Sequence, residues 1–170
     1  VQNSVCNGDD LGSINISPDG GTGNLISVWS DGSVSEELTN IISGTYSVIV
    51  TDARNCTATE NFVITEPLAY FPYFDQHHVM CFGDLTGSID FTISGNTPPY
   101  TYTWNNGANT QNLEYLAAGI YSVTVQDSNN CTESFDVTLI QPEELILSYS
   151  VYHATCEENN DGFITTNVSG

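Results

Sequence analysis

The sequence has almost no basic side chains. Of its 170 residues 21 are acidic and Arg54 alone is basic, which gives a formal net charge of −20. Proteins that bind nucleic acid neutralise phosphates with lysine and arginine, so this composition excludes that class of partner. An anionic membrane surface would repel the chain, and no apolar run is long enough to span a bilayer. We therefore expect neither nucleic-acid binding nor membrane insertion.

The residues that favour long helices are also scarce, and so are the motifs of common enzymes. Ala, Leu, Glu and Lys are few, whereas Ser, Thr, Asn and Gly are abundant beside nine Tyr and seven Phe. This aromatic content distinguishes the chain from disordered acidic segments, which cannot bury a core. The sequence contains no Gly-Lys-Ser/Thr phosphate loop and no Gly-x-Ser-x-Gly elbow. We predict a folded, β-rich chain that is not an enzyme.

An internal repeat is the strongest positive signal. The cysteines stand at positions 6, 56, 81, 131 and 156. The spacing between consecutive cysteines therefore alternates between a long interval and an interval of half that length. The offset that places Cys6 on Cys81 also places Cys81 on Cys156 and Cys56 on Cys131, without a gap. Over residues 1–67, 21 positions are identical at that offset. The chain is therefore built from copies of one unit, whose length is this offset.

The repeat sets the expected domain boundaries near Pro67 and Pro142. We predict a first repeat over residues 1–67, a second over residues 68–142 and the beginning of a third over residues 143–170. The sequence starts without an initiator methionine or a charged leader, so we expect a segment of a longer protein.

Each complete repeat carries one early and one late cysteine. We expect these to bond within the repeat, as Cys6–Cys56 and Cys81–Cys131, and Cys156 to lack a partner because the third repeat is incomplete. Such regular spacing is typical of secreted proteins in an oxidising compartment. A bridge that closes a loop of roughly 50 residues would contribute about 4 kcal/mol by the chain-entropy relation. A repeat of this size needs that contribution because its core is small.

Alternating apolar and polar residues predict the strands of each repeat. The clearest are residues 46–50 and 121–125. The other expected strands are residues 12–17, 25–29, 38–41 and 57–65, then 87–94, 100–104, 113–116 and 132–140, with residues 68–81 and 145–156 beginning the next repeat. Short strands, regular turns and one buried tryptophan per repeat, Trp29 or Trp104, predict tandem immunoglobulin-like two-sheet sandwiches with one disulfide each.

Three motifs resemble the SprB repeat. They are C-x-G-D-x-x-G-S-I over residues 81–89, G-x-T-P-P-Y-T-Y-T-W over residues 95–104 and G-x-Y-S-V-T-V-x-D-x-N-x-C over residues 119–131. The resemblance implies a very long, extracellular adhesin on the surface of gliding Bacteroidetes, exported by the type IX route. That family usually has glycine before the late cysteine, where this chain has Asn55 and Asn130. Asparagine tolerates the left-handed backbone that such a turn needs.

Acidic residues near the cysteines are candidate ligands for calcium, the one cofactor that the sequence suggests. The candidates are Asp9, Asp10, Asp52, Asp84, Asp127 and Asp161, with Glu157 and Glu158 in the matching loop of the third repeat. A Cys6–Cys56 bridge would bring the acidic residues of the first repeat to one end of the sandwich, and calcium binds six to eight oxygen atoms. No D-x-D-x-D-G loop is present. The alternative is that these residues are solvated turn acids that accept backbone hydrogen bonds.

A run of aromatic residues before the second early cysteine is a candidate binding site. It consists of Tyr70, Phe71, Tyr73 and Phe74. The run either packs at the junction between repeats or, if exposed, forms a patch for a ligand such as surface polysaccharide.

These features favour a structural stalk of a secreted protein, and the resemblance to the SprB repeat implies that it belongs to a bacterial adhesin used in gliding motility and surface attachment. Its expected partners are neighbouring repeats of the same chain and the surfaces to which the adhesin attaches. The alternatives are a carbohydrate-binding module and an accessory domain of a large secreted protein. Binding on a glycan array would favour the first alternative.

Overall fold

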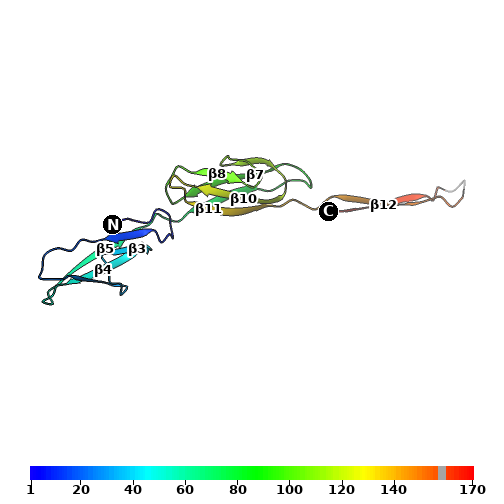
Figure 1. Ribbon diagram of the computed structural model, residues 1–170. Coiled ribbons are helices and arrows are strands. Elements are labelled where there is room, and N and C mark those ends of the chain that lie inside the picture. Colours follow the sequence, from blue (N-terminus) through cyan, green and yellow to red (C-terminus); the bar gives the residue numbers. More distant parts are fainter. Residues whose placement is uncertain (157–159) are drawn as a thin grey trace. The chain divides into compact units, whose positions relative to one another are not determined.

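The computed structural model describes residues 1–156 and 160–170 and confirms the all-β class (Figure 1). The described residues form thirteen strands and no helix. It follows that no membrane-crossing helix occurs in this part of the chain.

The first repeat contains five strands, at positions that the alternation of apolar residues predicts. They are β1 (Gly12–Asn15), β2 (Ile26–Trp29), β3 (Glu37–Ile41), β4 (Gly44–Thr51) and β5 (Thr57–Ile64). In the antiparallel pair of β4 and β5, Gly44 lies opposite Ile64 and Thr51 lies opposite Thr57, so the whole length of both strands is paired.

The second repeat contains the same strands preceded by one more. They are β6 (Phe71–His77), β7 (Gly87–Ser94), β8 (Thr101–Trp104), β9 (Leu113–Leu116), β10 (Gly119–Gln126) and β11 (Thr132–Leu139). The bounds of β8, β10 and β11 are those of β2, β4 and β5 moved by the offset that places Cys6 on Cys81. Identical residues at this offset therefore occupy equivalent places in the two repeats.

Each repeat is built from two sheets. In the first repeat β1 pairs with β3, and β2, β4 and β5 form the other sheet. In the second repeat the orders are β6-β7-β9 and β8-β10-β11. In the second repeat β6 pairs with β7, whereas at the equivalent place in the first repeat only a single β-bridge forms, between Gln2 and Ser13.

The two sheets of each repeat pack face to face over one tryptophan. In the first repeat Trp29 is buried with Ile14, Leu38, Val48 and Ile64, which come from all five strands. Its indole N–H donates a hydrogen bond of 2.7 Å to the backbone carbonyl of Ser35. The polar edge of the ring is thus satisfied within a hydrophobic core.

The second core adds an aromatic cluster around Phe91, which is fully buried on β7. The ring of Phe91 stacks on Phe74 with centroids 4.7 Å apart and meets Tyr102 and Trp104 edge-on at 5.9 and 6.0 Å. These contacts connect β6 and β7 to β8, and they confirm the prediction that Trp104 belongs to the core.

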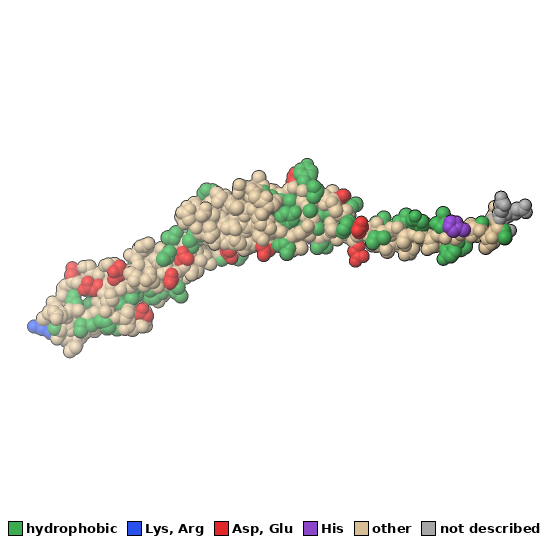
Figure 2. All heavy atoms as spheres, turned by 45° about the vertical axis from the view of Figure 1, so that its right-hand side comes forward, with side chains coloured by type: hydrophobic (Ala, Val, Ile, Leu, Met, Phe, Trp, Pro, Cys, Tyr) green, Lys and Arg blue, Asp and Glu red, His purple; other side chains and the backbone are tan. Residues whose placement is uncertain are grey.

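Two further strands, β12 (Ile146–Tyr152) and β13 (Phe163–Ser169), form an antiparallel hairpin. They correspond to β6 and β7 of the second repeat. Ile164 is 65% exposed, whereas its counterpart Ile89 is fully buried. Hydrophobic side chains accordingly stand at the surface of this hairpin (Figure 2). A two-stranded hairpin has no second sheet on which to bury such a face.

Internal contacts divide the chain into two compact units. The first consists of residues Val1–Phe71, Ile93–Thr101 and Val125–Glu133, and the second of Pro72–Thr92, Tyr102–Thr124 and Ser134–Gly170. Besides the first repeat, the first unit therefore contains three segments of the second repeat, residues 68–71, 93–101 and 125–133. The domain boundaries at Pro67 and Pro142 remain a prediction.

Candidate functional site

A disulfide between Cys6 and Cys131 joins the first repeat to the second. Their Cα atoms are 5.6 Å apart, a usual separation for bonded cysteines, and both residues belong to the first compact unit. Cys56, Cys81 and Cys156 are free and exposed. The predicted pairs Cys6–Cys56 and Cys81–Cys131 are therefore wrong, and the bridge connects repeats instead of closing each one.

The early and late cysteines of the first repeat cannot meet because they lie at opposite ends of β5. Cys56 directly precedes this strand. The chain around Cys6 lies at the other end, where the N–H of Ser4 donates to the carbonyl of Thr65 at 3.0 Å. An eight-residue strand spans about 26 Å at roughly 3.3 Å per residue. A disulfide bridges Cα atoms less than about 7 Å apart.

Strand β11 separates Cys81 from Cys131 in the same way. Cys131 directly precedes β11. Beyond the other end of the strand, the N–H of Val79 donates to the carbonyl of Ile140 at 3.0 Å, which places the turn at Cys81 there. The expected gathering of acidic residues at one end of the first repeat, which relied on a Cys6–Cys56 bridge, is wrong for the same reason.

The turn that carries Cys6 is held against the segment that connects the repeats. The N–H of Gly8 donates to Oε2 of Glu66 at 2.6 Å, and the side-chain amide of Asn7 donates to the carbonyl of Pro67 at 2.9 Å. The bond from Gly8 holds the pKa of the Glu66 carboxyl below its ordinary value. Cys6 is thereby fixed where the first repeat ends and the second begins.

The loop that carries Cys131 is held from the other side by Tyr70. The hydroxyl of Tyr70 donates a hydrogen bond of 2.9 Å to the carbonyl of Cys131, and its ring meets Tyr100 edge-on at 6.1 Å. Burial, followed by the negative charge of Asp127, raises the pKa of the Tyr70 phenol. The phenol therefore stays protonated and remains a hydrogen-bond donor.

A tight backbone contact completes the junction. The N–H of Asn96 donates to the carbonyl of Leu68 at 2.6 Å. Gly95 precedes it with φ +93°, and a Cβ atom at this position would overlap the carbonyl of Ala69. Only glycine allows both this backbone conformation and this approach. The loop before β8 thus packs directly on the connecting segment.

A hollow of about 310 Å³ lies beside the disulfide. The residues that line it are mostly polar and include Asp9, Glu133, Asn7, Asn96 and Asn130. Such a lining suits water or another polar species, because an apolar ligand would leave these groups without hydrogen bonds.

The carboxylates of Asp52 and Asp127 bind backbone N–H groups. Oδ1 of Asp127 accepts from the N–H groups of Asn129 and Cys131, both at 2.8 Å, and Oδ2 accepts from Thr97 at 3.2 Å. Oδ1 of Asp52 accepts at 2.8 Å from the N–H groups of residues 54 and 56, and Oδ2 accepts at 3.0 Å from residue 22. The bond from Cys56 is the main reason that the pKa of Asp52 is lowered. Asp52 and Asp127 thus have the hydrogen bonds expected of turn acids, which was the alternative to calcium binding in the sequence analysis above.

The remaining acidic candidates are dispersed. The N–H of Asp9 donates to Cys6, and that of Asp84 donates to Cys81. Asp10 is exposed, and Asp161 accepts from the N–H of Thr155 at 2.9 Å. Within residues 1–156 and 160–170, no three Asp, Glu, His or Cys side chains converge as a metal site, and Figure 2 shows acidic side chains at separate places. Glu157 and Glu158 lie outside the described residues, and calcium binding stays a prediction.

The aromatic run is divided between the interior and the surface. Tyr70 is buried at the junction and Phe74 is half-buried in the second core, whereas Phe71 is 59% and Tyr73 is 64% exposed. This division follows the alternation of side chains along β6. Ligand binding by Phe71 and Tyr73 remains a prediction.

The backbone confirms the expected left-handed turns before the late cysteines. Asn55 and Asn130 have φ angles of 64° and 66°. The role of Gly95 was not predicted from the sequence, although the second repeat shares this glycine with position 20 of the first. Nothing in the repeat distinguishes Tyr70, because leucine stands at the equivalent position 145.

The turn at Cys81, the loop at Gly95 and the buried Trp104 follow one another within the second repeat. Residues 75–109 match the family model of the SprB repeat. This match confirms the resemblance inferred from the motifs at residues 81–89 and 95–104. The two complete strands of the matched segment, β7 and β8, have β1 and β2 as their counterparts in the first repeat.

Among solved structures, that of the amphioxus IgVJ-C2 molecule is similar to this chain. The two are 13% identical, the alignment covers 77% of this chain and 97% of the amphioxus chain, and the TM-score is 0.33. Among curated proteins, none matches the sequence.

Proposed function

We propose that this chain is a structural, non-enzymatic segment of a secreted bacterial surface adhesin, in which tandem β-sandwiches form a stalk. The observation that carries this proposal is the Cys6–Cys131 bond between consecutive repeats. A bond within one core would stabilise that repeat alone, whereas this bond constrains the junction through which force along a stalk must pass.

The family match supports the extracellular part of the proposal. SprB repeats occur in adhesins on the cell surface, and a disulfide agrees with an oxidising location. The high net charge of −20 favours solubility and keeps neighbouring filaments apart. In this proposal the stalk serves gliding motility and attachment, and adhesion arises from many copies acting together.

Stretching single molecules of this chain from its two termini tests the mechanical role. The bond encloses a sequence separation of 125 residues, so force applied at the termini bypasses this loop. Reduction should add about 440 Å to the extended length, at roughly 3.5 Å per residue. Cys131→Ser is the matched variant and should show the full length without reductant. Equal extended lengths of the intact chain before and after reduction would refute the load-bearing role.

The exposed pair Phe71 and Tyr73 supports the second candidate function, carbohydrate binding. These residues lie two positions apart on the edge strand β6 and so point to the same face. Binding on a glycan array that is lost in Phe71→Ser/Tyr73→Ser, but kept in Tyr115→Ser at another exposed tyrosine, would favour this function. An array without signal would leave the stalk as the better account.

A further inference from the structure

Two cysteines of the complete repeats have no partner in the described part of the chain. Cys56 and Cys81 are both free and exposed, although each occupies the position of a bonded cysteine in the other repeat. Cys81 is the counterpart of Cys6, and Cys56 is the counterpart of Cys131. Exposed thiols are reactive in an oxidising compartment, so their fate there matters.

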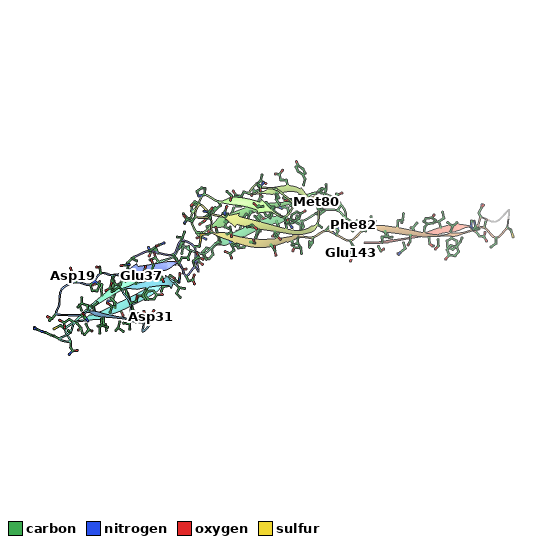
Figure 3. The ribbon with its side chains drawn as sticks, in the orientation of Figure 1. Asp19, Asp31, Glu37, Met80, Phe82 and Glu143 are labelled. Atoms are coloured by element: carbon green, nitrogen blue, oxygen red, sulfur yellow. A yellow bond between two sulfur atoms is a disulfide. The ribbon has the colours of Figure 1, made fainter. Side chains whose placement is uncertain are left out.

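The turn at Cys81 has the conformation of the bonded turn at Cys6. Gly8 and Gly83 have φ angles of 79° and 78°. The N–H of Gly83 donates to Oε1 of Gln141 at 3.0 Å, as that of Gly8 donates to Glu66 at the equivalent place in the first repeat. Met80 and Phe82, which flank Cys81, lie at the end of the second repeat near Glu143, from which the chain continues to β12 (Figure 3). Cys81 is therefore presented at the end of its repeat, as Cys6 is.

The loop at Cys56 has the conformation of the bonded loop at Cys131. The N–H of Asp52 donates to the carbonyl of Cys56 at 3.0 Å, and Asp127 and Cys131 form the same bond at the same distance. The aspartate carboxylates cap both loops with equal geometry, since each accepts from the N–H of its cysteine at 2.8 Å. The backbone that presents the sulfur atom for bonding is thus already formed around Cys56.

A hollow of about 160 Å³ lies beside Cys56, lined by Gly21, Leu25, Val50 and Asp52 among others. In the second repeat the counterpart of Leu25 is Tyr100, against which Tyr70 packs, and Tyr70 is bonded to the loop of the late cysteine. The hollow in the first repeat therefore corresponds to the place that Tyr70 occupies in the second repeat. It provides room for a further connecting segment beside Cys56.

We propose that Cys56 and Cys81 each form a disulfide with a neighbouring copy of this repeat. Cys81 bonds the late cysteine of the repeat after it, and Cys56 bonds the early cysteine of the repeat before it. Each bond has the 125-residue separation of Cys6 and Cys131. Early and late cysteines then connect every repeat to both neighbours, which makes the array a continuous covalent ladder. The inference rests on the tandem arrangement in the proposed function.

The oxidant is a protein disulfide of the compartment that folds the secreted chain. The thiolate of Cys81 attacks this disulfide, forms a mixed disulfide and releases one thiolate of the oxidant. The thiolate of the neighbouring late cysteine then attacks the Cys81 sulfur and releases the second. Two electrons and the two thiol protons end on the oxidant as a dithiol. Oxidised glutathione performs the same exchange in solution.

Two copies of residues 1–150 joined directly provide the test. The join keeps the repeat in register, because position 151 is the counterpart of position 1 two repeats later. Cys56 of the second copy then follows Cys81 of the first by 125 residues, the separation observed for Cys6 and Cys131. Each copy contributes four cysteines, at positions 6, 56, 81 and 131. The protein is folded in a mixture of reduced and oxidised glutathione, and its free thiols are counted under denaturing conditions.

The ladder predicts three disulfides and two free thiols in this protein of eight cysteines. Peptide mapping should find Cys6–Cys131 in each copy and Cys81 of the first copy bonded to Cys56 of the second. Cys56→Ser in the second copy should release one thiol, at Cys81 of the first copy. The same substitution in the first copy should instead remove one of the two thiols and leave the three disulfides unchanged.

Four free thiols, with only the two Cys6–Cys131 bonds, would overturn the proposal of a covalent ladder. The proposed stalk would still be supported, because the Cys6–Cys131 bond between repeats would be present. No free thiols, with each early cysteine bonded to the late cysteine of its own repeat, would overturn both. The chain of 170 residues, treated identically, is the control. It should keep three thiols, at Cys56, Cys81 and Cys156, because Cys56 and Cys81 lack a neighbouring copy to bond.

Discussion

Cys6 bonds Cys131 across 125 residues of sequence, while Cys56, which stands in the same repeat as Cys6, stays free. The late cysteine of one repeat thus meets the early cysteine of the repeat before it. By the chain-entropy relation a loop of this length contributes roughly 5 kcal/mol, more than the shorter loop expected within one repeat. The bond therefore stabilises the junction between the repeats, and only indirectly the individual cores.

The pairing is readily checked because the chain has one arginine, one methionine and no lysine. Trypsin cleaves after Arg54 and cyanogen bromide after Met80, which gives fragments 1–54, 55–80 and 81–170. We expect fragment 1–54 to stay bonded to fragment 81–170 under non-reducing conditions, and fragment 55–80 to carry the free thiol of Cys56. Pairing within repeats would instead bond 1–54 to 55–80 and leave 81–170 separate.

The hydrogen bond from Tyr70 to Cys131 should contribute measurably to stability. Tyr70→Phe keeps the ring against Tyr100 and removes only the donor, so we expect the free energy of unfolding to fall by about 1 kcal/mol. Urea unfolding of the oxidised chain measures this difference. Tyr73→Phe, at an exposed position of the nearby strand β6, is the control and should leave the free energy unchanged. An equal effect of both substitutions would contradict the role of Tyr70 at the junction.

Asp127 should be more important for stability than its position in a loop suggests. Asp127→Ala leaves the N–H groups of Thr97, Asn129 and Cys131 without their acceptor. We expect the free energy of unfolding to fall by about 3 kcal/mol, and by about 1 kcal/mol in Asp127→Asn, which keeps one oxygen. Asp136→Asn on the exposed face of β11 removes the same charge and serves as control. Equal losses for Asp127→Asn and Asp136→Asn would show that charge alone matters.

The strands were predictable from sequence because the alternation of apolar residues is a local signal. Val48, Val123 and Val125 fall on the buried face that the pattern of residues 46–50 and 121–125 predicts. The disulfide was not predictable in this way. Its pairing depends on which end of β5 the turn at Cys6 approaches, and that depends on contacts with residues 65–67, which are distant in sequence.

The candidate site was predictable in chemistry but not in geometry. The acidic residues before the late cysteines were expected to be calcium ligands or turn acids, and the hydrogen bonds of Asp52 and Asp127 fit the second kind. The partners on residues 22 and 97 come from a loop that is distant in sequence. No spacing rule identifies such a partner, since the contact depends on the packing of two sheets.

Stability should decline at acidic pH through carboxylates at the two ends of the first repeat. A hydrogen bond from the N–H of Cys56 lowers the pKa of Asp52, and one from the N–H of Gly8 lowers the pKa of Glu66, in both cases from the ordinary value of the carboxyl group. A lowered pKa in the folded state adds stability above the unfolded value and loses it as pH falls through the folded value. We expect the unfolding midpoint to be level near neutral pH and to fall below about pH 4.5. Glu66→Gln should flatten part of this fall, and an unchanged profile would contradict the role of Glu66.

Calcium is the remaining prediction from the sequence, and the structure sharpens its test. Three N–H groups surround each carboxylate of Asp52 and Asp127, and such donors repel a cation. We therefore expect equal unfolding midpoints in millimolar calcium and in magnesium at the same ionic strength, both slightly above the midpoint in EDTA because divalent ions screen a net charge of −20. A ligand specific for the folded state must raise the midpoint further. A rise specific to calcium, lost in Asp84→Asn but kept in Asp90→Asn, would restore the acidic turn at Cys81 as a calcium site.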